Sequence, residues 1–265
     1  MKFKRFKDII IKNREYEKSV KESVKYFHDC VQWDGDIPKI MKEIGKKLDV
    51  LIIEIPMKDS DFGACFLETG YSRYLLLNSN QPRSKMYFSF CHDIYHILKG
   101  NPDYINEKRE VHFNKDYASN ENEGKANLFA ANLLMPEVEF KKMYLQYEKD
   151  SDLIEEVLIK LMNYFNAPFV AVLIRIYELK ILKEIEDVKD FLEYDDKKIE
   201  KLCDDLWIDK EILEPTLKDE IQNVLELLKK EGTELIQKQL MSEYDFNNII
   251  ENIKGLYSQI KLTND

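Results

Sequence analysis

Two of the chain's four histidines, His92 and His96, stand four residues apart, and no other pattern in the sequence has a clearer chemical meaning. In a helix this spacing places both imidazoles on one face, about 6 Å apart along the axis, where they can point at a single ion. Asp93 adds a carboxylate directly after the first histidine. The three residues therefore predict a metal site with an acidic group beside it.

A metal site that performs hydrolysis needs about three protein ligands, so that a fourth position is left for water. Glu123 is our candidate for the third ligand, because it lies at the start of a second predicted helix, 27 residues after His96. Asn127 and small alanines share its stripe, and small residues let two helices approach closely. His112 is another candidate third ligand, with an ordinary surface position as the alternative.

The spacing of apolar residues along the chain predicts which helices and strands hold these candidate ligands. The helix with the two histidines is predicted from Pro82, in its first turn, to about Leu98. Three short apolar runs precede it and predict a small antiparallel sheet, at residues 49–56, 63–68 and 72–78. The polar stretch 101–120 is predicted to be a loop of about 20 residues, which we interpret as a substrate-gating element.

Helical patterns cover most of the remaining chain, at about residues 3–31, 36–48, 120–134, 137–146, 152–164, 169–179, 219–230 and 237–260. The pair 152–164 and 169–179 has the outline of a helix-turn-helix. Arg175 is the only firm positive charge of its second helix, which favours packing over DNA reading. We predict an α+β, mostly helical fold, divided into a helical segment 1–35, a domain 36–182 and a helical extension 183–265.

Composition narrows the class of protein. The net charge of −10 disfavours a whole-surface nucleic-acid binder, and no stretch approaches the roughly 20 apolar residues of a membrane span. We recognise no export signal. The four cysteines, which lack metal-knuckle spacing, are expected to be reduced and mostly buried thiols in a cytoplasm, namely Cys30, Cys65, Cys91 and Cys203. The oligomeric state is left open.

Two blocks of sequence resemble a known family. They are Cys-His-Asp-Ile-Tyr-His at residues 91–96, and the block 123–136, which fits Glu-x-x-Ala-Asn-x-Phe-Ala-Ala-x-Leu-Leu-Met-Pro. Together with the helix after Pro168 they resemble the ImmA/IrrE family of zinc metallopeptidases. The likeness covers about residues 37–182.

The resemblance implies a minimal zincin-like fold and a cytoplasmic zinc endopeptidase. It implies His92, His96 and Glu123 as ligands of Zn²⁺, and Asp93 as the catalytic base. It also implies a protein substrate, a DNA-binding repressor of the helix-turn-helix type from a phage or mobile element. The family's base is glutamate, as in the His-Glu-x-x-His motif, and Asp93 is shorter by one C–C bond, about 1.5 Å. Since a positioned base contributes about 10²- to 10⁴-fold, activity depends on that difference.

Three other interpretations stay open at this point. The chain is alternatively a catalytically weak or inactive zinc-binding relative that acts as a regulatory protein-interaction module through its C-terminal helices. A metal phosphohydrolase of the HD type, with His28 as its upstream histidine, is disfavoured because strands precede His92 and Glu123 would have no role. A purely structural histidine pair is disfavoured by the cost of burying polar groups without partners.

Overall fold

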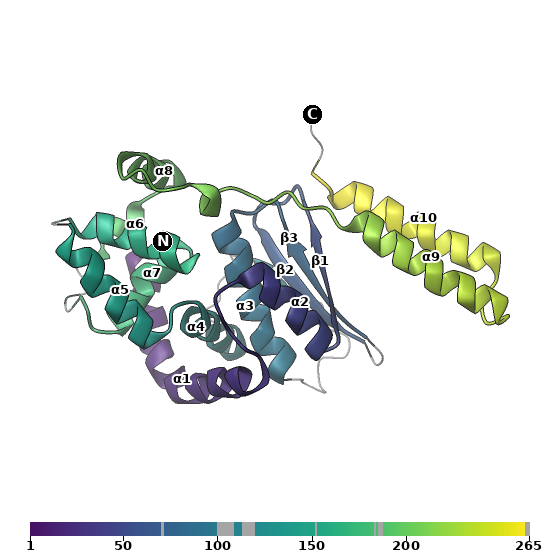
Figure 1. Ribbon diagram of the computed structural model, residues 1–265, viewed down its shortest axis with the longest axis horizontal. Coiled ribbons are helices and arrows are strands. Elements are labelled where there is room, and N and C mark those ends of the chain that lie inside the picture. The colour runs from purple at the N-terminus through teal and green to yellow at the C-terminus, as the bar shows by residue number, and fades with distance from the viewer. Residues whose placement is uncertain are drawn as a thin grey trace.

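The structure is a computed structural model of the chain, and it describes residues 1–69, 72–99, 109–112, 120–151, 153–182, 184 and 188–262. Figure 1 shows a small sheet with helices packed beside it and a separate helical hairpin that extends away from it. The described elements are mostly helical, which confirms the predicted α+β, mostly helical fold. The predicted division at residues 35 and 182 stays a prediction.

The sheet has four strands in the order β1-β3-β2-β4, namely β1 (Val50–Ile55), β2 (Phe62–Glu68), β3 (Arg73–Asn78) and β4 (Arg109–His112). The three predicted strands are confirmed. Pairing is antiparallel between β2 and β3 and between β2 and β4, but parallel between β1 and β3. The prediction of an all-antiparallel sheet was therefore wrong, because side-chain alternation along a strand is the same for both kinds of pairing.

The predicted loop at residues 101–120 was also wrong in part, because β4 forms the sheet edge beside β2. A strand of four residues gives too little alternation to be recognised between polar neighbours. The remainder of that stretch up to residue 119 lies outside the described residues, and so does the gating role that we assigned to it.

The first two helices pack against different elements, α2 against β1 and α1 mainly against α4. Helix α2 (Ile37–Lys47) begins at Asp36, whose side chain accepts a hydrogen bond from the backbone N–H of Lys39. Helix α1 (Phe3–Cys30) packs along α4 (Glu121–Leu134). Their close approach depends on Gly124, since a Cβ atom there would lie 2.9 Å from Cε2 of Tyr16. The N-terminal segment thus covers one side of α4.

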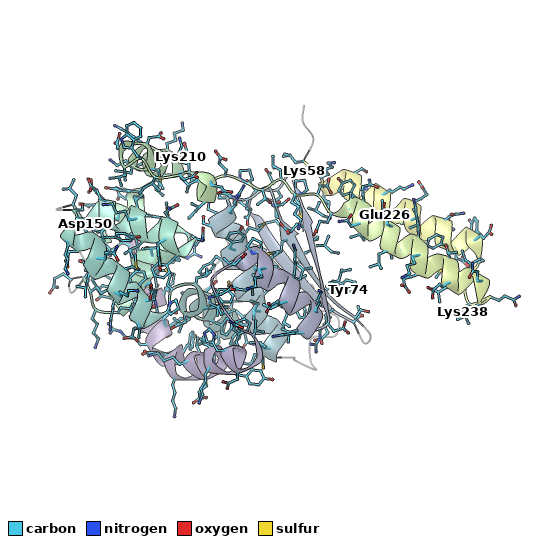
Figure 2. All side chains as sticks on the ribbon, in the orientation of Figure 1. Lys58, Tyr74, Asp150, Lys210, Glu226 and Lys238 are labelled. Atoms are coloured by element: carbon cyan, nitrogen blue, oxygen red, sulfur yellow. The ribbon has the colours of Figure 1, made fainter. Side chains whose placement is uncertain are left out.

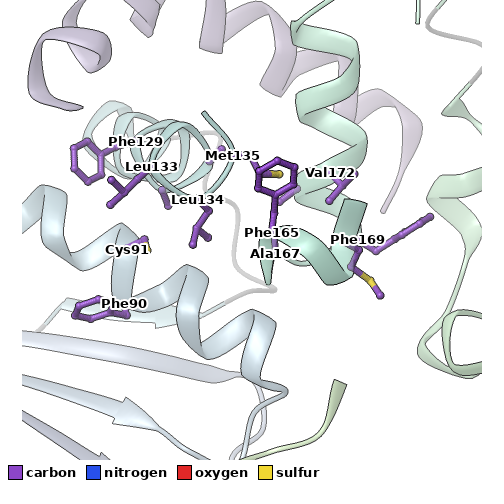
Figure 3. Close-up of a cluster of buried hydrophobic side chains, with 14 of the residues drawn as sticks. Phe90, Cys91, Phe129, Leu133, Leu134, Met135, Phe165, Ala167, Phe169 and Val172 are labelled. Atoms are coloured by element: carbon purple, nitrogen blue, oxygen red, sulfur yellow. The ribbon is translucent and has the colours of Figure 1, made fainter. Parts of the chain in front are cut away.

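Helix α3 (Arg83–Lys99) packs against both the sheet and α4. Its apolar side chains include Phe90 and Ile94, which are fully buried, and Leu75 and Leu77 of β3 are buried with them. Side chains of α3, α4 and the following helices meet in one core (Figure 3). Because α3 is buried on several sides, its polar residues are enclosed as well.

Three helices follow α4: α5 (Glu137–Lys149), α6 (Ile154–Phe165) and α7 (Phe169–Glu178). Between α6 and α7, Asn166 adopts a left-handed conformation with φ 49°. Arg175 is 4% exposed and donates a hydrogen bond from Nε to the carbonyl oxygen of Met135, 3.0 Å away. Arg175 is therefore held inside the protein, and most of α7 is buried with it, in agreement with the packing role predicted for this helix.

The segment after α7 leads the chain back to α3. After η4 (Asp190–Glu193), α8 (Asp196–Asp205) and η5 (Glu211–Leu213), the chain reaches α3, where the Arg83 N–H donates to the carbonyl oxygen of Glu214 over 3.1 Å. Non-helical residues separate the helices of the extension that we predicted at residues 183–265.

The chain then forms a hairpin of α9 (Ile221–Gln237) and α10 (Glu243–Ile260), which has a small core of its own. The labelled Glu226 and Lys238 lie on its exposed surface (Figure 2).

Among the described residues no single helix is long and apolar enough to cross a membrane. Helices α6 and α7 meet the length and hydropathy criteria only when they are taken together, as a pair bent by 108°.

Candidate metal centre

Helix α3 places His92 and His96 one turn apart on the face that packs against α4. His92 is completely buried and His96 is 6% exposed. Their Nε2 atoms lie 3.2 Å apart. The helical spacing expected from the sequence therefore brings both imidazoles to one point inside the protein.

Helix α4 brings Glu123 to the same point from its first turn. One carboxylate oxygen, Oε2, lies 3.1 Å from Nε2 of His92, and the other, Oε1, lies 3.3 Å from Nε2 of His96. The Asn120 side chain accepts a hydrogen bond from the Asn122 N–H and fixes the start of this helix. The structure thus brings together His92, His96 and Glu123, the three candidate ligands of the sequence analysis.

The donor spacing fits a divalent metal. The three donor atoms form a triangle with sides of 3.1 to 3.3 Å. A tetrahedral centre with metal–ligand bonds of about 2.0 to 2.1 Å has ligand–ligand distances of about 3.3 to 3.4 Å, so the ligands need almost no movement. Among the described residues, only this group has three such side chains within reach of one ion.

The charges of the site reinforce this arrangement. Burial lowers the pKa of His92, but the hydrogen bond to Glu123 and the charges of Asp93 and Glu123 outweigh it, so the pKa is raised. Burial raises the pKa of Glu123, but hydrogen bonds from His92 and His96 hold this pKa well below its usual range. The carboxylate is therefore ionised throughout the physiological pH range and available as a ligand.

Asn127 fixes the orientation of His92. Its Oδ1 atom lies 2.9 Å from Nδ1 of His92. An amide oxygen only accepts hydrogen bonds, so Nδ1–H donates to Asn127, and the ring is held with Nε2 directed at Glu123, where a metal can displace the Nε2 proton. The sequence placed Asn127 on the correct stripe of the helix without indicating this role. The sequence feature that could have indicated this role is the position of Asn127 one helical turn after Glu123.

Asp93 and Cys91 flank His92 on α3, and both are completely buried. Burial raises the pKa of the Cys91 thiol well above its ordinary value, so the thiol is neutral and is a poor ligand or nucleophile. Cys91 is thus a small core residue, as predicted. Cys203 is buried too, whereas Cys30 is exposed, so burial of the cysteines is less general than expected.

The other two histidines stand apart from this group. His28 is an exposed residue near the end of α1, with its ring 5.8 Å from that of Phe27, and it is not in the three-residue group. The upstream histidine that an HD-type phosphohydrolase would require is therefore missing from the described part of the site. His112 lies in β4, where the structure describes the backbone only.

Comparison with known proteins agrees with the geometry. Residues 46–177 match the family model Peptidase_M78, described as the IrrE N-terminal-like domain. Helices α3 and α4, and with them all three clustered donors, lie inside the matched segment. A search of curated proteins gives no significant match. Through this domain, the chain belongs to the ImmA/IrrE family of metallopeptidases.

Proposed function

We propose that this protein is a zinc-dependent endopeptidase that cleaves a specific intracellular protein in the cytoplasm. The observation that carries the proposal is the triangle of His92, His96 and Glu123 donors, with sides of 3.1 to 3.3 Å, inside a metallopeptidase domain. Two histidines and a glutamate form a common donor set of catalytic zinc sites.

The residues of the site have separate roles. His92, His96 and Glu123 would hold Zn²⁺, which when bound supplies a Lewis acid for the peptide carbonyl and lowers the pKa of water. Asn127 holds the His92 ring in the tautomer that presents Nε2. The burial of His92 and His96 keeps bulk water away from the ligands, which strengthens the electrostatic interactions inside the site.

Asp93 is the proposed general base. It would take a proton from the attacking water and transfer it to the leaving amine. A glutamate at this position would reach about 1.5 Å further, because it has one more C–C bond. The rate therefore depends on how closely the shorter side chain approaches the reacting water. The competing function is a zinc-binding regulatory module without peptidase activity. It rests on the shorter reach of Asp93 compared with glutamate.

The proposed substrate is a DNA-binding repressor with a helix-turn-helix, from a phage or mobile element. This part of the proposal is supported by the family resemblance. A repressor gene beside the gene for this chain would identify the protein to test. Direct binding of nucleic acid by the chain itself is disfavoured by its net charge of −10.

The experiment combines metal analysis with a cleavage assay. The full chain is purified with zinc, its metal content is measured by mass spectrometry, and it is incubated with the neighbouring repressor. We expect one zinc per chain and cleavage at one or a few bonds, with no cleavage by Asp93→Asn. One zinc per chain without cleavage, by both the natural protein and Asp93→Glu, would contradict peptidase function and favour the regulatory module.

A further inference from the structure

A cavity of about 460 Å³ lies between α1, α3, α4, α7 and α8. This volume is within the range of about 300 to 1,000 Å³ that is typical of ligand sites. In Figure 1 the chain after α8 runs along the top of the view, from the side of α6 and α7 toward the sheet. The cavity is thus lined by the N-terminal helix, by the middle of the chain and by residues 194–213.

The cavity borders the candidate metal centre at His92, while the other two proposed ligands, His96 and Glu123, are not among its lining residues. His92 and Asn127 both line it, and they are the hydrogen-bonded pair that orients the site. Phe88 lies one turn before His92 on α3 and lines the same space. A group that occupies the cavity would therefore lie beside His92, one of the three proposed ligands.

The walls of the cavity are mainly apolar. Phe88, Phe169 and Ile174 supply large apolar surfaces. Charged side chains also line it, among them Lys85 and Asp196, whose charged groups lie 3.8 Å apart. Apolar walls with a few charged groups suit a large uncharged side chain whose backbone stays in polar surroundings.

Part of the lining comes from outside the segment that matches the family. Ile9 belongs to α1, before residue 46, and Tyr194 and Ile199 lie beyond residue 177. The rings of Phe169 and Tyr194 are stacked, with centroids 5.8 Å apart and an angle of 2° between their planes. The matched domain and the added C-terminal segment thus build one continuous wall.

We propose that this cavity binds a large apolar side chain of the protein substrate, next to the bond that is cleaved. Helix α1 and the α8 segment, which lie outside the matched domain, decide which side chain fits. This inference rests on the proposed function, because it assigns the cavity to the substrate of the same site. It also gives the N-terminal helix and the first part of the C-terminal extension a role in specificity.

The test measures binding separately from cleavage. The zinc-loaded full chain carrying Asp93→Asn is titrated by calorimetry with capped hexapeptides of glycine that contain one variable residue: leucine, phenylalanine, alanine or aspartate. We expect the leucine and phenylalanine peptides to bind at least about tenfold more tightly than the other two, because only they bury a large apolar side chain.

Two tryptophan variants on one helix provide a matched comparison. Ile9→Trp fills the cavity from α1, whereas Ile11→Trp adds the same bulk at a side chain that is 57% exposed and does not line the cavity. We expect Ile9→Trp to abolish the preference for large apolar residues and Ile11→Trp to keep it. If Ile9→Trp does not fold, Val170→Trp fills the cavity from α7, with exposed Val138→Trp as its control.

The outcomes separate this inference from the proposed function. Equal affinities for all four peptides, or an unchanged preference in a folded cavity-filling variant, would overturn the apolar pocket. Cleavage of a protein substrate by the natural chain without preference for a large apolar residue near the bond would overturn it too, while the peptidase proposal stands. Selective binding of the leucine and phenylalanine peptides without any cleavage would support the pocket and contradict the peptidase.

Discussion

The Nδ1 atom of His92, on α3, lies 2.9 Å from the side-chain oxygen of Asn127, on α4. This hydrogen bond links the two helices that supply the candidate metal ligands. It also sets the tautomer of His92. The packing of α3 against α4 therefore determines whether Nε2 of His92 is available to bind a metal.

The first prediction concerns Asn127. Asn127→Ala removes the acceptor for the His92 Nδ1–H, so we expect zinc affinity to fall by about 10- to 100-fold. Asn127→Asp keeps an acceptor oxygen in place, and we expect it to retain most of the affinity. Competition with a chromophoric chelator measures both constants. Equal affinity in Asn127→Ala and the natural protein would mean that other contacts orient the ring.

The second prediction concerns the ligands. His92→Ala and Glu123→Ala each remove one of three donors, and we expect both to lose stoichiometric zinc. His28→Ala is the control, because this exposed histidine is outside the cluster, and it should keep one zinc per chain. Metal content is measured by mass spectrometry after gel filtration. Full occupancy in both ligand variants would show that the assignment is wrong.

The third prediction concerns Asp93. Asp93→Asn removes the proposed base, so we expect cleavage to slow by about 10²- to 10⁴-fold while zinc content is unchanged. Asp93→Glu restores the longer reach, and we expect zinc to stay bound and the cleavage rate to rise. Because Asp93 is completely buried, the additional methylene should also cost about 1 to 3 kcal/mol of stability.

Cleavage rates and thermal unfolding separate these two effects of Asp93→Glu. A slower rate in a variant that is folded and loaded with zinc would indicate that the site is built around aspartate. An unchanged rate in Asp93→Asn would remove Asp93 from the mechanism.

The fourth prediction concerns pH. The pKa of His92 is raised above its ordinary value of 6.5 in the metal-free protein, so zinc has to displace a proton at lower pH. We expect the apparent zinc affinity to weaken by about tenfold per pH unit for each proton displaced, once the pH falls below the raised pKa. Chelator competition between about pH 8 and pH 6 measures this slope.

The same pKa shifts affect the stability of the metal-free protein. The contribution of His92 is fully present below about 6.5, its unfolded value, and is lost as the pH rises through the raised folded pKa. The contribution of Glu123 is present above 4.5 and is lost as the pH falls through its depressed folded pKa. Unfolding of metal-free protein should therefore show both contributions together between these two values. A Glu123→Gln variant that unfolds with the same pH dependence would contradict this.

The fifth prediction concerns the C-terminal hairpin. A Cβ atom at Gly232 would lie 2.1 Å from Cε2 of Phe246, whereas one at Gly255 meets nothing within 4 Å. We expect Gly232→Ala to separate α9 from α10 and to increase hydrogen exchange in both helices. Gly255→Ala, the control, should stabilise α10 by about 0.5 to 1 kcal/mol through helix propensity. Equal protection in both variants would argue against the close helix contact.

Much of the local structure could be predicted because it depends on neighbours in the sequence. The helical pattern predicted at about residues 36–48 corresponds to α2, and Asp36 provides its capping hydrogen bond. Short apolar runs marked β1, β2 and β3, and the 3.6-residue period marked α3 and α4. The helical spacing of His92 and His96 was sufficient to place their imidazoles together.

Strand order and the short edge strand could not be predicted in the same way. Strand β3 inserts between β1 and β2, so β1 finds a parallel partner that is not its neighbour in sequence. That choice depends on which faces are buried under α3, and the alternation within each strand is compatible with either pairing. Strand β4 is too short to differ from its polar surroundings.

By itself the sequence determined the chemical groups of the site, because ligand types and helical spacing are local properties. Only the tertiary structure decided that Glu123 Oε2 lies 3.1 Å from His92, and that Asn127 occupies the far side of the same ring. It alone decided that Ile9 and Ile199 line one cavity with His92. These contacts join residues far apart in the chain, and their positions follow from how the helices bury their apolar faces against one another.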